Sequence, residues 1–188
     1  MRVVGGRLRG RALVTPKDDA TRPTSDRVRE AAFNILAHGI DGFSLEGAKV
    51  LDLFAGTGAL GIEALSRGAV FCLFVDEGAE ARGVIRENVE ALALTGITKI
   101  FRRDATDLGP AGKYEQFTLL FLDPPYGKGL AAQALSAAAA GGWIAKKAIV
   151  VIEEHKDYGV ELPPQFTVLD RRSWGDTQMI FAHFLGSV

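Results

Sequence analysis

The chain has 188 residues, of which 47% are hydrophobic and 24% are charged, and its formal net charge is −1. This length allows one domain with a sizeable core, and this composition excludes a disordered or fibrous protein. No hydrophobic run approaches the ~18 residues of a membrane-spanning helix, and the first residues lack the apolar stretch of a signal peptide. The one cysteine, Cys72, cannot form an intrachain disulfide, so we expect a cytoplasmic protein without membrane association.

The charges are distributed unevenly along the chain. Residues 1–30 hold eight Arg or Lys and four Asp or Glu, so this part carries +4 and the remainder −5. A basic arm on an acidic body favours a polyanionic partner, whereas the alternative is a solvated tail. The glycines predict that the arm is mobile. We divide the chain into the basic N-terminal arm and its helix, residues 1–38, and a main domain, residues 39–188. The arginines expected to contact the phosphates of such a partner, an RNA in the interpretation below, are Arg7, Arg9, Arg11 and Arg22.

The hydrophobic pattern predicts the elements that follow the arm. Ser25 or Asp26 would cap a helix whose buried face holds Val28, Ala32, Ile35 and Leu36. Strands are expected at residues 50–54, 70–75, 97–102, 117–122 and 148–152, and helices at 59–67, 80–94 and 130–140. Residues 166–170 and 179–185 would form a terminal hairpin around Gly175. Short apolar runs that alternate with helices are typical of a parallel sheet covered on both faces.

Acidic residues stand at or near the ends of all five predicted parallel strands. They are Asp52, Asp76, Asp104, Asp123 and Glu153. Because ligands of such sheets bind outside the carboxyl ends of the strands, these acids mark the expected site. The alternative is that some of them only cap the helices and turns that follow.

The segment Gly56-Thr-Gly-Ala-Leu-Gly61 matches a G-x-G-x-x-G loop between a strand and a helix. Ile62 follows it, which excludes a Walker A phosphate loop. Asp52, four residues before Gly56, would repel the pyrophosphate of a dinucleotide but attract the sulfonium and ammonium groups of S-adenosylmethionine. An NAD-type site and a tight turn without a ligand remain alternatives for this loop.

Two further strand ends complete a nucleoside site. Asp76 lies 20 residues after Gly56, where a carboxylate can accept hydrogen bonds from both ribose hydroxyls. Asp104 can accept from the exocyclic amine of adenine, and the backbone of Ala105 can contact the ring.

The segment Asp123-Pro124-Pro125-Tyr126 directly follows the fourth predicted strand. The two prolines stiffen the loop and leave its acceptors exposed. The Asp123 carboxylate and the Pro124 carbonyl can hold the N–H bonds of an amine conjugated with a ring, so that its lone pair points at a methyl donor. Tyr126 would stack on a flipped or single-stranded base. The alternative is a stiff turn whose tyrosine packs on the core.

Two other chemistries find no support in the sequence. Cytosine C5 methylation needs a cysteine nucleophile, and Cys72 lies inside a predicted strand as a core residue. The three histidines, His38, His155 and His183, are scattered without other ligands at suitable spacing, so no metal is expected.

These motifs resemble those of class I S-adenosylmethionine-dependent methyltransferases that act on amino groups. The front of the chain narrows the resemblance, which covers essentially the whole sequence: Val3-Val4-Gly5-Gly6-Arg7-Leu8-Arg9-Gly10-Arg11 and Thr21-Arg22-Pro23-Thr24-Ser25-Asp26-Arg27-Val28-Arg29-Glu30 are similar to the start of the RsmD-type methyltransferases. The resemblance implies a Rossmann-like α/β fold with a seven-stranded, mostly parallel sheet and an antiparallel terminal hairpin. It also implies methyl transfer to guanine N2 of 16S ribosomal RNA. We expect this RNA to be met within a small-subunit particle or an assembly intermediate, and the protein to act as a monomer.

The resemblance also assigns roles to individual residues. The methionine part and backbone of the cofactor would be contacted by Asp52, Ala55, Gly56 and Gly58. Asp76 would hold the ribose, and because the ribose-binding acid is often Glu in the family, the adjacent Glu77 is the alternative. Asp104 and Ala105 would hold the adenine. Asp123, Pro124 and Tyr126 would hold the target base, and Pro125 completes this catalytic segment by stiffening the loop.

Three alternative functions stay open. A DNA adenine-N6 methyltransferase shares the Asp-Pro-Pro-Tyr loop but usually carries a large target-recognition segment, for which there is no room here. An NAD-linked oxidoreductase would use the same glycine loop. A non-catalytic RNA-binding module would depend on the arm, and a cofactor titration separates it from the enzymes.

Overall fold

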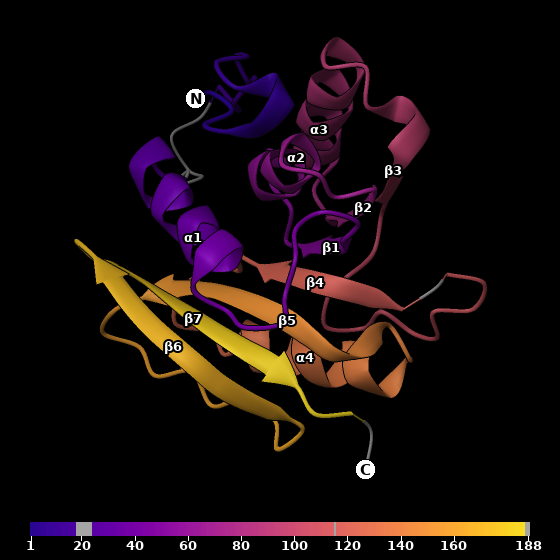
Figure 1. Ribbon diagram of the computed structural model, residues 1–188. Coiled ribbons are helices and arrows are strands. Elements are labelled where there is room, and N and C mark those ends of the chain that lie inside the picture. The colour runs from indigo at the N-terminus through magenta and orange to yellow at the C-terminus, as the bar shows by residue number, and fades with distance from the viewer. Residues whose placement is uncertain (18–23, 115, 187–188) are drawn as a thin grey trace.

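The computed structural model describes residues 1–17, 24–114 and 116–186. Within them, seven strands form one sheet in the order β3-β2-β1-β4-β5-β7-β6 (Figure 1). The strands are β1 Lys49–Leu53, β2 Phe71–Val75, β3 Thr98–Phe101, β4 Phe117–Leu122, β5 Ile144–His155, β6 Phe166–Trp174 and β7 Thr177–Phe184. Strands β1 to β5 run parallel, and β7 inserts antiparallel between β5 and β6. The predicted seven-stranded sheet with an antiparallel terminal hairpin is confirmed.

Helices cover both faces of the sheet. They are α1 Asp26–His38, α2 Ala59–Ser66, α3 Ala79–Ala91 and α4 Leu130–Ala140. Helices α1, α2 and α3 contribute to the apolar core on one face, and α4 contributes to the core on the other (Figure 1). None of the helices in the described parts of the chain is long and apolar enough to cross a membrane.

Helix α1 begins where the sequence predicts. The Ser25 side chain accepts a hydrogen bond of 3.2 Å from the Val28 N–H, which satisfies a backbone donor at the start of the helix. Ala32 and Leu36 are buried as expected, whereas Val28 and Ile35 are only partly buried. Phe33 takes their place on the buried face, and it packs on Phe121 with ring centroids 5.6 Å apart.

Strand β5 is longer than its apolar run. The sequence predicts residues 148–152 with Glu153 after the end, but the strand runs from Ile144 to His155 and includes Glu153 and Glu154. Antiparallel pairing with β7 extends the strand through both acids. At its start, Lys147 has a φ of 68°, and the pairing with β4 shifts register in this region. Both extensions come from partners that lie far away in the sequence, so the apolar run alone cannot predict them.

The N-terminal segment is a docked hairpin and not a mobile arm. Residues 1–14, here called the N-terminal hairpin, fold back on themselves through a bridge between Arg2 and Ala12. The hairpin packs its buried apolar side chains into the core that also holds α2 and α3; they are Val3, Leu8 and Leu13. A Cβ built at Gly6 would lie 2.0 Å from the Ser66 carbonyl oxygen, and its φ is +74°. Glycine is needed here for close packing and a turn, so it does not signal mobility.

Candidate active site

A glycine loop joins β1 to α2 at the carboxyl end of the sheet. Its backbone enters the left-handed region at Phe54, Gly56 and Gly58, with φ of 55°, 57° and 79°. The Gly56 N–H donates a hydrogen bond of 2.9 Å to Asp76 Oδ2, and the Gly78 N–H donates one of 2.8 Å to Asp76 Oδ1. Asp76 therefore holds the glycine loop beside the loop that follows β2. Each carboxylate oxygen keeps a second lone pair for a hydroxyl group of a ligand.

Asp52 lies beneath the glycine loop. Its side chain is buried, and its Oδ2 accepts a hydrogen bond of 3.0 Å from the Gly61 N–H. Burial raises the pKa of Asp52 well above its usual range, the Gly61 N–H opposes this rise, and the nearby charge of Asp76 adds to it. In the structure the carboxylate fixes the start of α2.

Gly61 lies in a closely packed region under this loop, and its substitution tests that packing. A Cβ at this position would lie 2.5 Å from Phe74 Cε1, 2.6 Å from Cys72 Sγ and 3.0 Å from Asp52 Oδ2. We therefore expect Gly61→Ala to lower the free energy of unfolding by about 2 kcal/mol through overpacking. Thermal unfolding measures this as a Tm several degrees below that of the wild type.

Gly83 provides the matched control for that substitution. It lies within α3, and a Cβ built there meets no described atom within 4 Å. Because alanine is the better helix former, Gly83→Ala should keep or slightly raise the Tm. A Gly61→Ala protein as stable as the Gly83→Ala protein would contradict the packing argument.

Asp104 closes β3 with a local turn. Its Oδ1 accepts hydrogen bonds from the Thr106 hydroxyl (2.6 Å) and the Thr106 N–H (2.8 Å). These bonds lower the pKa of Asp104, the hydroxyl being the larger cause. Ala105 beside it is buried. Because β2 and β3 are neighbours, Asp104 and Asp76 stand at adjacent strand ends.

Glu77, the alternative to Asp76 as the ribose-binding acid, is exposed, and its carbonyl accepts a hydrogen bond from Arg82.

The Asp-Pro-Pro-Tyr segment, here called the acceptor loop, follows β4 next to the glycine loop. The Asp123 N–H donates a hydrogen bond of 3.5 Å to the carbonyl of Leu53, the last residue of β1, so the two loops start side by side. Pro124 is buried and Pro125 is exposed. Burial raises the pKa of Asp123 well above its usual range, and the negative charges of Glu153, Asp52 and Glu154 raise it further. Asp123 is therefore poised to accept a proton.

Tyr126 is anchored at both its hydroxyl and its ring. The hydroxyl donates a hydrogen bond of 3.0 Å to Glu153 Oε1, and the ring centroid lies 5.9 Å from that of His155. Burial, followed by the charge of Glu153, raises the pKa of Tyr126, so the phenol stays protonated at neutral pH. The Gly127 N–H, next in the chain, donates to Glu154. Two acids of strand β5, Glu153 and Glu154, thus hold the acceptor loop and the residue after it by hydrogen bonds.

A buried ion pair that the sequence analysis does not predict connects α1, α2 and the N-terminal hairpin. Arg29 is fully buried, and its Nε lies 3.4 Å from Glu63 Oε2. Glu63 also accepts hydrogen bonds from the N–H groups of Val4 (2.9 Å) and Gly5 (2.8 Å), and it pairs with Arg67. Arg29 Nη2 also pairs with Asp26 Oδ1 at 2.9 Å, but its buried partner Glu63 stands 34 residues away in the sequence.

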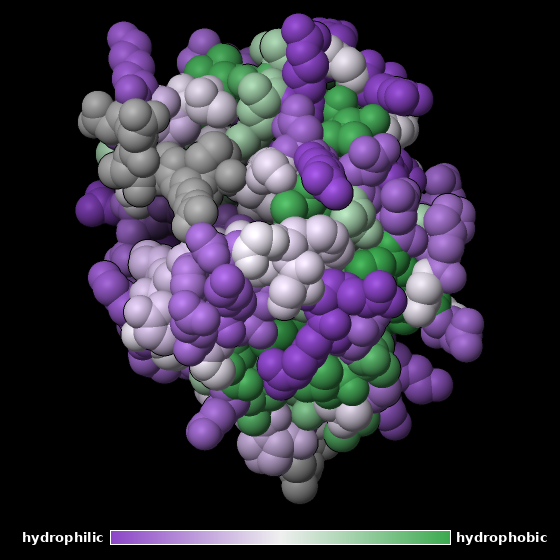
Figure 2. All heavy atoms as spheres, turned by 90° about the vertical axis from the view of Figure 1, so that its left-hand side faces the viewer, coloured by the Kyte–Doolittle hydropathy of each residue, from purple (hydrophilic) through white to green (hydrophobic). Residues whose placement is uncertain are grey.

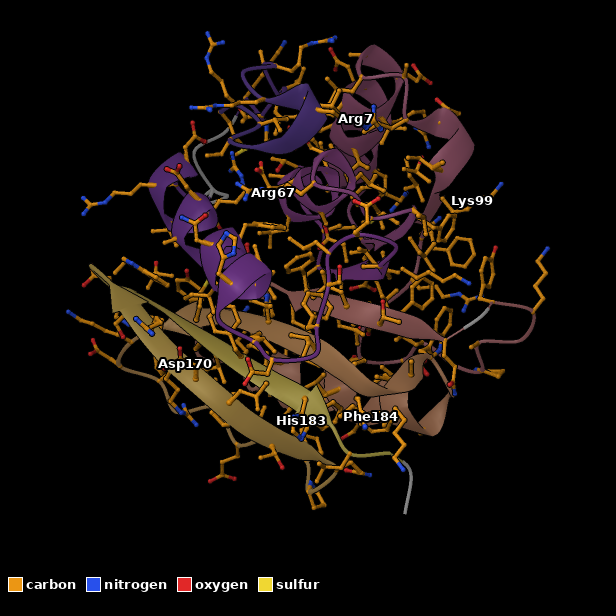
Figure 3. The ribbon with its side chains drawn as sticks, viewed as in Figure 1. Arg7, Arg67, Lys99, Asp170, His183 and Phe184 are labelled. Atoms are coloured by element: carbon orange, nitrogen blue, oxygen red, sulfur yellow. The ribbon has the colours of Figure 1, made fainter. Side chains whose placement is uncertain are left out.

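The predicted RNA-binding arginines lie on the N-terminal hairpin, apart from one. Arg7, Arg9 and Arg11 are exposed, and Arg22 lies outside the described residues. Arg11 Nη2 also donates a hydrogen bond of 3.2 Å to the carbonyl of Ala91, the last residue of α3. Figure 2 shows hydrophilic side chains projecting from the end of the molecule that holds the hairpin. In Figure 3, Arg7 lies on the hairpin and Arg67 lies near α1, where it stacks on Phe33.

Comparisons with known proteins agree with this architecture. A family model described as conserved hypothetical protein 95 matches residues 1–183. Ribosomal RNA small subunit methyltransferase D of Escherichia coli is 34% identical over 164 residues, which cover 87% of this chain and 79% of the relative. YlbH of Bacillus subtilis is 44% identical over 128 residues, which cover 67% of each chain.

Solved structures show the same fold. The structure of yhhF from Escherichia coli superposes with a TM-score of 0.84 at 28% identity and covers 100% of this chain and 99% of its own. Since the family model matches nearly the whole sequence and a relative named ribosomal RNA small subunit methyltransferase D is 34% identical over 87% of it, the chain belongs to the RsmD-type family of class I methyltransferases.

Proposed function

We propose that this protein transfers a methyl group from S-adenosylmethionine to the exocyclic N2 of a guanine in small-subunit ribosomal RNA. The observation that carries the proposal is the acceptor loop, which stands beside the glycine loop at the end of β4 with the proton-accepting Asp123 at its start. Support for the RNA comes from relatives named as ribosomal RNA small subunit methyltransferases.

The residues around the glycine loop fit S-adenosylmethionine. Among the described atoms, the nearest to a Cβ built at Gly56 is Phe54 O at 4.0 Å, so a ligand can approach this backbone closely. The methionine part would lie along Ala55, Gly56 and Gly58, with the charge of Asp52 beneath it. Asp76 would bind the ribose, since it stands at the glycine loop while Glu77 is exposed. Asp104 and Ala105 would meet the adenine. The cofactor supplies an electrophilic methyl group.

The chain's own residues would prepare the guanine amine for attack. The lone pair of this nitrogen is delocalised into the ring, so the nitrogen is a weak nucleophile. The Asp123 carboxylate and the Pro124 carbonyl would accept hydrogen bonds from its two N–H groups, so that the lone pair is held pointing at the methyl group. As the new N–C bond forms and the bond between the methyl group and the sulfur breaks, the nitrogen would lose a proton, and the raised pKa of Asp123 suits it to take that proton. Tyr126 would stack on the base.

The cofactor is the first test. We expect the protein to bind S-adenosylmethionine and its demethylated product and not to bind NAD at comparable strength, because the Asp52 carboxylate lies beneath the glycine loop, where the pyrophosphate of NAD would lie. Isothermal titration calorimetry with the three ligands measures this. Tight NAD binding without a signal for S-adenosylmethionine would favour the oxidoreductase instead.

The reaction itself is tested with small-subunit ribosomal RNA, both naked and in assembled particles. We expect methyl transfer only in the presence of S-adenosylmethionine, and mass mapping should place the product on guanine N2. Methylation of adenine N6 in DNA would support the alternative methyltransferase. Cofactor-independent RNA binding without any transfer would support the non-catalytic module.

A further inference from the structure

Glu153 has a carboxylate that joins two distant parts of the chain. Glu153 lies in the interior strand β5, where it follows a run of apolar residues, and it is 3% exposed. One carboxylate oxygen, Oε1, accepts the hydrogen bond from the Tyr126 hydroxyl at 3.0 Å. The other, Oε2, accepts a hydrogen bond from the hydroxyl of Thr24, just before α1. The acceptor loop and the segment that leads into α1 therefore meet at one buried charge.

Thr24 is held from its other side by Arg29. The Thr24 carbonyl accepts a hydrogen bond of 3.5 Å from Arg29 Nη1, and the Arg2 carbonyl accepts one from Arg29 Nη2. Arg29 in turn contacts Glu63, which binds the backbone of the N-terminal hairpin. A continuous set of polar contacts thus runs from the hairpin through Arg29 and Thr24 to Glu153 and the hydroxyl of Tyr126.

This arrangement restricts the Tyr126 ring. A tyrosine at the edge of an open site has rotamer freedom that it must lose when a base stacks on it. A hydrogen bond from its hydroxyl to a buried carboxylate fixes the ring beforehand, because hydrogen bonds to charged groups are stronger than those between neutral groups. The ring would then be preorganised for stacking, so base binding would cost less conformational entropy.

We infer that Glu153 is a positioning residue of the methyl-acceptor site. Its carboxylate accepts hydrogen bonds from both Tyr126 and Thr24 and so connects the base-binding site to the N-terminal hairpin. The inference rests on the proposed function. It adds a role for a residue that touches neither the base nor the cofactor.

The contacts of Glu153 can be separated by a double-mutant cycle. Tyr126→Phe and Thr24→Val each remove one hydroxyl from Glu153 and should each lower kcat by about tenfold, as expected for a lost hydrogen bond to a charged group. Because both act through one carboxylate, the double variant should lose much less than the product of the two effects. Thr24→Ser restores the hydroxyl and should restore kcat. Affinity for S-adenosylmethionine should stay unchanged in all of them.

The charge of Glu153 is tested by the pH dependence of kcat. Asp123 is faced by Asp52 from β1, by Glu153 and Glu154 from β5, and by the Tyr126 hydroxyl. Glu153→Gln removes one of these negative charges, so the pKa of Asp123 should fall and the acidic limb of the kcat profile should move to lower pH. A purely structural role would lower kcat without moving the limb. Glu161→Gln makes the same chemical change at an exposed site and should move neither.

The outcomes distinguish this inference from the proposed function. If the wild type transfers no methyl group to RNA, the proposed function fails. If the wild type is active but the double variant shows fully multiplicative losses, Thr24→Ser gives no rescue, and the Glu153→Gln limb stays in place, then Glu153 does not position the site. If Glu153→Gln does not fold, the cycle between Thr24 and Tyr126 still decides.

Discussion

Asp123→Ala should lower the rate of methyl transfer by about 100-fold or more and leave the affinity for S-adenosylmethionine nearly intact. Asp123 stands at the start of the acceptor loop, and its N–H contacts the end of β1 at 3.5 Å. The substitution removes the group that would orient the guanine amine and take its proton. It leaves the backbone of the glycine loop and Asp76 in place, and these are the groups expected to hold the cofactor. Single-turnover rates and calorimetry on the same preparation measure the two quantities.

Asp123→Asn is the matched control, because it keeps the shape of the side chain and removes its charge. The folded-state pKa of Asp123 is raised by burial and by neighbouring acids. A raised folded-state pKa means that the stabilising contribution of this group is complete at low pH and is lost as the pH rises through that pKa. At neutral pH the asparagine variant should therefore have a higher Tm than the wild type, and this difference should disappear under acidic conditions.

The two measurements together locate the function of Asp123. A slow but more stable Asp123→Asn protein indicates a charge that is kept for chemistry at a cost in stability. Turnover close to the wild-type rate in Asp123→Ala would contradict the assignment of the acceptor loop. A lower Tm for Asp123→Asn at neutral pH would contradict the raised pKa.

The fold was predictable because its main signals are local. Continuous apolar runs such as residues 117–122 have the composition of strands buried on both faces, and each is followed by a polar turn and a helical stretch. The acids at the ends of these runs come together because parallel strands share one carboxyl edge. The position of Asp52, Asp76 and Asp123 around the glycine loop could therefore be predicted from the strand ends alone.

The contacts that the sequence did not predict depend on residues far apart in the chain. Arg29 is fully buried and is paired with Glu63 and with backbone carbonyls, and its ion pair with the nearby Asp26 does not by itself indicate this burial. Glu153 was predicted to follow its strand, but pairing with β7 keeps it inside. Its partner Thr24 stands 129 residues away. Long-range polar partners leave no periodic pattern, so only the structure reveals them.

The docked hairpin changes the physical basis of the proposed RNA contact. A mobile arm would lose conformational entropy when RNA orders it, whereas this hairpin is already fixed on α2 and α3 by Val3, Leu8 and Leu13. Its exposed arginines therefore form a preorganised basic surface on a chain whose remainder carries −5. Most of the attraction for RNA should come from this surface.

The combined variant Arg7→Ala/Arg9→Ala/Arg11→Ala should bind the RNA substrate more weakly and with a flatter salt dependence. Each phosphate contact contributes roughly 0.7–0.9 to the slope of log K against log salt concentration, so the slope should fall by about two to three units. Affinity for S-adenosylmethionine should hardly change, because the cofactor site is formed by the strand ends. Filter binding or fluorescence anisotropy across a salt series measures the slope.

Two further variants make this prediction specific. Arg11 also caps the end of α3 through the Ala91 carbonyl, so the double variant Arg7→Ala/Arg9→Ala isolates the effect on RNA and should lower the slope by about one and a half to two units. Arg171→Ala/Arg172→Ala removes two exposed charges from β6, on the far side of the sheet from the hairpin (Figure 1), and should leave the slope nearly unchanged. If the hairpin and β6 variants flatten the slope equally, RNA binding depends only on the overall charge of the protein. If the hairpin variants keep wild-type affinity and slope, the hairpin is a structural element without a role in RNA binding.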